Sequence, residues 1–245
     1  MKLTKERMVW ERKIWFKNLV ENCPKCKGQK NYYENNTLKQ CDCMTTYDGI
    51  IQLIESGFPV RFLSKGIDDI HNKSYYGIVS NYISNFINNF RKGNNLLITL
   101  GNKNYDEKLI LTSILAKNIA RIQNAPCQRQ CTVWYTLFEE LVQLSLCSSS
   151  EYSCKKTIDS FINTPDVLIL DGLGSETGLN TNAKHNARLL DLIVKNRYNN
   201  CQPTIICTDL KQDQLSISYL ESTVNIINQN FINIDINTTY NDNDF

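Results

Sequence analysis

Residues 96–121, LLITLGNKNYDEKLILTSILAKNIAR, begin with a run of apolar residues, turn at Gly101, cross a polar segment and continue as a helix. An apolar strand that ends at a glycine and leads through a loop into a helix has the outline of a phosphate-binding loop. The residues that such a loop uses to hold phosphate are not at their usual places here. The stretch therefore predicts the strand–loop–helix unit of an α/β fold and leaves a nucleotide site in question.

The rest of the chain continues this alternation. Apolar strands separated by amphipathic helices are expected at residues 96–100, 131–136, 166–171 and 203–208. Near-continuous apolar strands are typical of a parallel sheet covered by helices on both faces. Ligands of such sheets bind at the C-terminal ends of the strands, where Gly101, Asp171 and Thr208 are expected. We therefore predict that three loops meet at one crevice.

Four cysteines gather in a short polar segment. Cys23 and Cys26 form a C-x-x-C pair, and Cys41 and Cys43 form a C-x-C pair fourteen residues later. A hairpin of this length brings four thiolates around one tetrahedral zinc ion, whereas the alternative is four unrelated free thiols. Four sulfur ligands leave no open position, so the zinc is expected to be structural. Most of the other cysteines are expected to be small buried residues: Cys127, Cys131, Cys147, Cys154, Cys201 and Cys207.

A helix is expected on each side of the cysteine segment. In the first, residues 4–22, a stripe at helical spacing contains Met8, Ile14, Trp15 and Leu19, with Trp10 and Phe16 off that stripe. This pattern fits either packing against the rest of the protein or a helix that binds a partner. The second helix ends at Gly57, and Pro59 fixes an extended connector after it. We place an N-terminal helix and zinc module at residues 1–56 and the α/β domain at residues 57–245.

Charge and hydropathy exclude few functions. The chain of 245 residues has 27 Lys and Arg against 25 Asp and Glu, and its net charge of +2 argues neither for nor against nucleic acid. No run approaches the ~18 consecutive apolar residues of a membrane span, and the N-terminus is charged where a signal peptide is apolar. We therefore expect a cytoplasmic protein that does not enter a membrane.

Six segments, taken in chain order, resemble the bacterial and phage replicative-helicase loaders, the DnaC/DnaI group with the related IstB transposition helpers. They are CPKCKG, CDC, SGFPVRF, VWYTLFEELVQLSL, DVLILDGLGSE and LLDLIVKNRYNNCQPTIICTDL, and together with the strand–loop–helix unit they extend from about Cys23 to Leu210. The resemblance implies an AAA+ P-loop-type parallel sheet sandwiched by helices. It also implies ATP and magnesium as cofactors and a DnaB-like replicative helicase as partner.

The phosphate loop departs from the family pattern G-x-x-x-x-G-K-[ST]. Without a gap, Asp106 takes the place of the second glycine, Glu107 that of the lysine and Lys108 that of the hydroxyl residue. One extra loop residue makes Lys108 the lysine but leaves Leu109 at the hydroxyl position. Either alignment turns a carboxylate toward the phosphates, and like charges about 4 Å apart cost roughly 4 kcal/mol at an effective dielectric of about 20.

The second half of the nucleotide site is also incomplete. Asp171 has the position that holds a magnesium-bound water, but Gly172 replaces the next acidic residue of the family, and Glu176 is expected to be a loop carboxylate. Asp209 stands where the loaders have a polar sensor after Thr208, and residues 216–240 contain no arginine to reach a neighbouring subunit. We therefore expect no catalytic residues and doubt ATP and magnesium binding. The vestigial nucleotide-binding residues are Gly101, Lys103, Lys108, Asp171 and Thr208.

Three functions remain open from the sequence. The first is a non-catalytic loader-type protein, of phage or mobile-element origin, that binds a DnaB-like helicase through residues 1–50 or joins a catalytic loader in a homo- or hetero-oligomer. The second is an active loader whose phosphate contact is Lys103 or Lys108. The third is a zinc-dependent single-stranded-DNA binder, suggested by basic and aromatic residues in the zinc module: Lys25, Lys27, Lys30, Tyr32, Tyr33 and Lys39.

Two further residue types receive structural expectations. Arg188 and Arg197 are expected on the helix that follows Asp171, either at a subunit interface or in salt bridges at the edge of the core. His71 and His185 are isolated in the sequence and are expected to face solvent, and neither has a partner arrangement that suggests catalysis or metal binding.

Overall fold

The computed structural model describes residues 3–70, 75–99, 105–122, 129–147, 152–178 and 183–236. The N-terminal part contains α1 (Lys5–Phe16), the π-helical turn η1 (Lys17–Glu21), β1 (Asn31–Glu34), β2 (Thr37–Gln40), α2 (Asp42–Ser56) and the short 3₁₀ turns η2 (Val60–Phe62) and η3 (Ile67–Asp69). The α/β part contains α3 (Tyr76–Ser84), α4 (Phe86–Lys92), β3 (Asn95–Thr99), α5 (Tyr105–Ala120), β4 (Val133–Leu137), α6 (Phe138–Cys147), α7 (Tyr152–Asn163), β5 (Val167–Leu173), η4 (Ser175–Gly178), α8 (Ala183–Asn199), β6 (Thr204–Thr208), α9 (Gln212–Ser218), α10 (Glu221–Asn230) and β7 (Phe231–Asp235).

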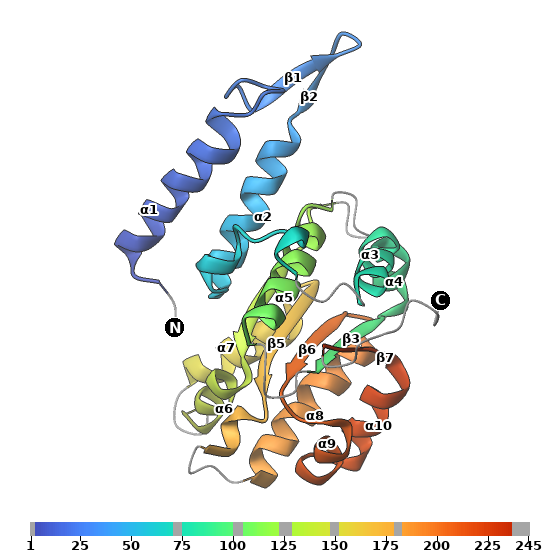
Figure 1. The fold of residues 1–245 in the computed structure, drawn as a ribbon. Helices are drawn as coiled ribbons and strands as arrows, with labels where there is room; N and C mark the ends of the chain where they lie inside the picture. The colour runs from blue at the N-terminus through green and yellow to red at the C-terminus, as the bar shows by residue number, and fades with distance from the viewer. Residues whose placement is uncertain are drawn as a thin grey trace.

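Five parallel strands form the central sheet in the order β4-β5-β6-β3-β7 (Figure 1). Alternate residues of each strand face opposite sides, so Ile98 and Ile169 join one core while Leu97 and Leu168 join the other. Helices α2, α3 and α5 cover the first face, and α6 to α10 cover the second. The predicted parallel sheet between two helical layers is therefore confirmed.

The N-terminal part projects from the sheet as an arm. Helices α1 and α2 run side by side and lead to the β1–β2 hairpin at the end of the arm far from the sheet (Figure 1). Thr4 caps α1 by accepting a hydrogen bond from the Arg7 backbone N–H. Gly57 ends α2 with a φ of 102°, a left-handed conformation that favours glycine. The predicted stripe of α1 lies against the main core through Met8, Trp15 and Leu19.

Helix α2 seals one edge of the sheet. The outer edge of β4 offers backbone N–H groups, and two of them donate to α2 side chains: Val133 to Gln52 Oε1 at 2.7 Å and Tyr135 to Ser56 Oγ at 3.0 Å. Leu53 and Ile54 of the same helix are fully buried in the core. Helix α2 is thus packed as part of the α/β core, and the predicted division after residue 56 stays a prediction.

Arg197 has a role that neither expectation named. Its side chain is fully buried and donates hydrogen bonds to backbone carbonyls that precede β5 and β6 and to one hydroxyl. The acceptors are Ile162 O, Pro165 O, Asp166 O, Pro203 O and Thr204 Oγ1. Burial lowers its pKa to about 9. The guanidinium therefore holds two loops together inside the protein, instead of lying at a subunit interface or in a salt bridge at the edge of the core. Arg188, on the same helix, is exposed.

Several smaller expectations were wrong. His185 is half-buried instead of facing solvent, and its Nε2 lies 2.6 Å from Ser145 Oγ. Cys147 and Cys201 are exposed, whereas Cys131 and Cys207 are buried as expected. His71 and Cys127 lie outside the described residues.

Within the part of the chain that the structure describes, no helix has both the length and the apolarity to cross a membrane.

We predict that Gln52→Leu destabilises the protein by about 1–3 kcal/mol, because it leaves the Val133 N–H buried without an acceptor. Urea unfolding followed by tryptophan fluorescence measures the change. Gln229→Leu on the exposed face of α10 is the matched control and should change stability by less than about 0.5 kcal/mol. Equal stability of the two variants would show that α2 does not seal the β4 edge.

Candidate functional site

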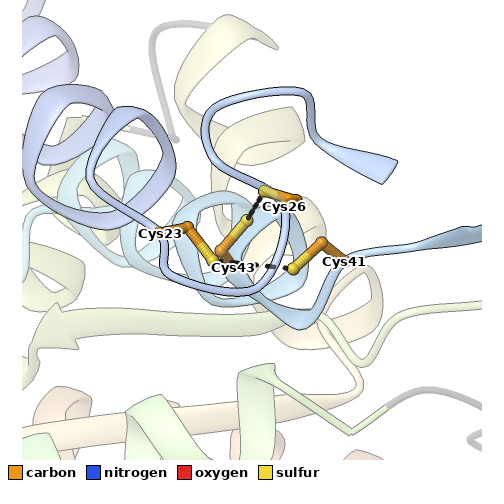
Figure 2. A group of neighbouring side chains, drawn as sticks. All are labelled: Cys23, Cys26, Cys41 and Cys43. Carbon is orange, nitrogen blue, oxygen red and sulfur yellow. Dashed lines mark hydrogen bonds between the residues drawn. The ribbon is translucent and has the colours of Figure 1, made fainter. Parts of the chain in front are cut away.

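The four predicted cysteines meet at the base of the hairpin (Figure 2). The sulfur atoms of Cys23 and Cys41 are 3.7 Å apart, those of Cys26 and Cys43 are 3.5 Å apart, and all four lie within 4.8 Å of one another. Four sulfurs bound to one zinc at about 2.3 Å in a tetrahedron would be about 3.8 Å apart. The donor set and the two shortest sulfur–sulfur distances therefore fit a tetrahedral zinc ion.

The chain supplies these ligands from two local structures. Cys23 and Cys26 flank the turn after η1, and Cys41 and Cys43 lie at the N-cap and in the first turn of α2. Backbone N–H groups of Cys26 and Lys25 lower the pKa of Cys23 to about 7, whereas burial raises the pKa of Cys41 and Cys43. A bound cation would favour the thiolate form of the two thiols whose pKa is raised, Cys41 and Cys43. Zinc bound here would join α2 to η1 and the hairpin.

We predict that the purified protein contains one zinc ion per chain and that Cys26→Ser loses it. Without the ion the segment between Cys23 and Cys43 has no apolar core of its own, so trypsin should cleave at its exposed lysines. Elemental analysis and mass spectrometry of the digest measure the two effects. Cys201→Ser, at an exposed cysteine away from the cluster, should keep the zinc and resist cleavage. Wild-type protein that is free of zinc yet protease-resistant would refute the site.

A buried ion pair occupies the predicted crevice. Lys108 Nζ, from the first turns of α5, lies 2.9 Å from Asp171 Oδ1 in β5, and both side chains are 1% exposed. Asp209, after β6, lies on the outside of this pair, with Oδ1 3.8 Å from the same ammonium group and a side chain 61% exposed. Lys108, Asp171 and Asp209 therefore lie together, and the Lys108 ammonium group is directed at the Asp171 carboxylate.

Asp171 has further partners on its buried side. The Tyr135 hydroxyl donates to its Oδ2 at 2.8 Å, and the Gly172 backbone N–H donates to its Oδ1 at 2.7 Å. Burial alone would lower the pKa of Lys108, but the nearby Asp171 carboxylate outweighs it and the pKa of Lys108 is raised. Lys108 is therefore charged at neutral pH, and its charge is balanced inside the protein.

Tyrosine hydroxyls also engage the other two buried carboxylates near this crevice. Tyr75 donates to Glu107 Oε1 at 2.5 Å, and Tyr219 donates to Glu176 Oε1. Glu176 also accepts from the Gly174 backbone N–H at 2.8 Å. Burial, followed by the adjacent carboxylate, raises the pKa of both tyrosines. The sequence pattern did not single out these tyrosines, because each is separated from its carboxylate by a long stretch of chain.

The remaining predicted positions have different surroundings. Thr208 is buried, donates to Leu173 O at 2.7 Å and accepts from the Leu210 N–H at 3.0 Å, so it ties the β5 loop to β6. Asp106 is exposed and pairs with Arg61 at 3.1 Å. Gly101 and Lys103 lie outside the described residues, so their assignment as vestigial phosphate contacts stays a prediction.

The five-stranded parallel sheet between two helical layers is an α/β fold that other solved structures share. Among solved structures, this chain is similar to DnaI, with a TM-score of 0.55 and 17% sequence identity. The likeness covers 73% of this chain and 94% of the DnaI chain. This chain is also similar to a primosome component of Streptococcus pyogenes serotype M3, described as putative, with a TM-score of 0.54 and 16% identity over 76% and 92% of the chains.

A third similar structure is AMPPCP-bound DnaA from Aquifex aeolicus, with a TM-score of 0.51 and 15% identity. This likeness covers 68% of the present chain and only 48% of DnaA, so the chain spans about half the length of that relative. No protein-family model and no curated protein matches the sequence. The resemblance to DnaI-type AAA+ proteins is thus confirmed at the level of the fold.

We predict that Lys108→Met destabilises the protein by roughly 3–5 kcal/mol, because it leaves the Asp171 carboxylate buried without its counter-ion. The double variant Lys108→Met/Asp171→Asn should recover much of this loss, since the amide is neutral. Urea unfolding of both variants tests the expectation. Lys195→Met removes a half-exposed ion pair with Asp191 and should cost less than about 1 kcal/mol. A single variant as stable as this control would contradict the buried pair.

Proposed function

We propose that this protein is a non-catalytic AAA+ protein of the helicase-loader type, which acts by binding a DnaB-like replicative helicase or a catalytic loader without hydrolysing ATP. The observation that carries the proposal is the buried Lys108–Asp171 pair. An active site of this class needs the lysine on the outer phosphates and the aspartate on magnesium. Here each of these two groups is the partner of the other.

The surroundings of the pair support the same conclusion. Asp171 already accepts from Tyr135 and from its neighbouring backbone N–H, so magnesium would have to replace three donors. The residue after it is Gly172, which has no carboxylate to orient an attacking water. Glu176 is buried and hydrogen-bonded to Tyr219, so its carboxylate is not available to act as a substitute base. Each acidic group that chemistry would need is instead part of the folded interior.

The active loader is the second candidate. Lys108 lies at the C-terminal edge of the sheet, where the phosphates of a nucleotide would lie, so ATP would have to draw it away from Asp171. The single-stranded-DNA binder has less support from the hairpin. Lys25 lies 4.0 Å above the Tyr32 ring, and Lys39 pairs with Glu34, so part of the basic and aromatic surface already has internal partners.

The proposal includes a cytoplasmic location and a structural zinc ion that supports the arm. It assigns contact with the helicase to the N-terminal arm, which projects from the α/β core (Figure 1). A protein that docks without an ATP cycle would hold the helicase or block it. The origin in a phage or mobile element, and the oligomeric state, are parts of this hypothesis.

We predict that the zinc-loaded protein captures a DnaB-type helicase of the same cell equally well with and without ATP. A non-catalytic subunit has no nucleotide switch, so binding should not depend on the nucleotide. Biolayer interferometry with immobilised protein measures this. In parallel, titration with a fluorescent ATP analogue and magnesium should show no saturable binding up to millimolar concentration.

Two results would overturn the proposal. Saturable micromolar binding of the analogue that is lost in Lys108→Ala would revive the active loader. Failure of both a helicase and a catalytic loader to bind the folded, zinc-loaded protein would remove the loader-type function itself.

A further inference from the structure

A groove lies along the arm, between the end of α1 and α2. It has a volume of about 410 Å³ and is lined by Arg12, Lys13, Phe16, Lys17, Glu21 and Tyr47. Phe16 and Tyr47 meet edge to face, with ring centroids 5.4 Å apart, and are both half-buried. The groove therefore has an aromatic floor and a predominantly basic rim.

The walls of this groove are fixed before any partner arrives. Arg12 of α1 pairs with Glu55 of α2, which ties the two helices together across the arm. At the other end α1 continues into the π-helical turn η1, where the Asn22 N–H donates to Lys17 O at 3.3 Å, five residues back. Such wide turns are rare and are frequently found at functional sites. A preformed wall lowers the entropy that a partner loses on binding.

The rim carries positive charge that the described part of the chain does not neutralise. Lys13 and Lys17 are exposed, and no described carboxylate lies within ion-pair distance of either one. They continue a helical stripe that begins at Trp10, a residue that is 48% exposed and whose ring has the Arg7 guanidinium 4.0 Å from its centroid. Val9 beside it is 52% exposed. Aromatic residues and arginine on an exposed helix face are typical of interface anchors.

We propose that this groove binds an acidic peptide segment of the protein partner, with an apolar side chain on the Phe16–Tyr47 floor and carboxylates on Lys13 and Lys17. The inference rests on the proposed function, because it assumes that the arm binds a protein. It adds the site on the arm and the chemistry of the segment that the site selects. Opposite charge at the rim supplies selectivity, and the aromatic floor supplies the buried contact.

The floor favours a peptide over a single-stranded nucleic acid. Bases bind by stacking on open aromatic faces. Lys30 Nζ lies 5.2 Å above the Phe16 ring, and Tyr47 packs against the same ring edge to face. Lys30 thus occupies a face of the Phe16 ring on which a base would stack, whereas an aliphatic or aromatic side chain can pack against ring edges and lysine stems.

The test compares binding of the DnaB-type helicase by the full-length, zinc-loaded protein and two charge-reversed variants. Lys13→Glu/Lys17→Glu should weaken binding by about tenfold or more, because it turns attraction of the acidic segment into repulsion. Arg91→Glu/Lys92→Glu makes the same change in net charge at exposed positions of α4 and should bind like the wild type. Trp10→Ala, at an exposed position, should also weaken binding while leaving the fold intact.

A photo-crosslinker at position 13 then identifies the captured segment by mass spectrometry, and a segment with net negative charge is expected. If the Lys13→Glu/Lys17→Glu variant binds the helicase as tightly as the wild type does, the proposed peptide groove is wrong while the proposed function stands. If the wild-type protein binds neither a helicase nor a catalytic loader, the proposed function on which the groove rests is refuted instead. Binding of oligothymidylate that is lost in the same double variant, together with no acidic crosslinked segment, would assign the groove to nucleic acid and refute the peptide.

Discussion

The buried pair of Lys108 and Asp171 is the interaction on which the rest of the crevice depends. Two unit charges that are both 1% exposed are stable only together, because either one alone would lose its hydration without compensation. Their contact fixes the start of α5 against the end of β5. It also gives Lys108 a counter-ion inside the protein. The position of α5 and the charge balance of the crevice are therefore linked through one contact.

The same principle extends to the neighbouring acidic side chains. Glu107, Asp171 and Glu176 each accept a hydrogen bond from a tyrosine, and these tyrosines come from three separate places in the chain. A carboxylate that is satisfied by the protein has little free energy to gain from magnesium or water. At this edge of the sheet the three carboxylates therefore belong to a packed polar region.

The arm is connected to that core through α2. Its first turn carries two of the predicted zinc ligands, and its last turns supply Gln52 and Ser56 to the edge of β4. A helix held at both ends is a rigid connection, so the hairpin and the groove have a defined position relative to the sheet. Zinc at one end and buried hydrogen bonds at the other would thus hold the arm in one position relative to the sheet.

The sequence by itself determined the fold class and the four cysteines, because apolar runs, helical spacing and C-x-x-C pairs are local patterns. It also brought Lys108, Asp171 and Thr208 to one edge, because parallel strands end together. Only the tertiary structure decided that Lys108 is buried on Asp171 and that the three tyrosines complete the crevice. Those tyrosines lie 32 to 43 residues from their carboxylates, a separation that no local pattern encodes. The buried Arg197 escaped prediction for a similar reason, since most of its acceptors are backbone carbonyls and carry no signature in the sequence.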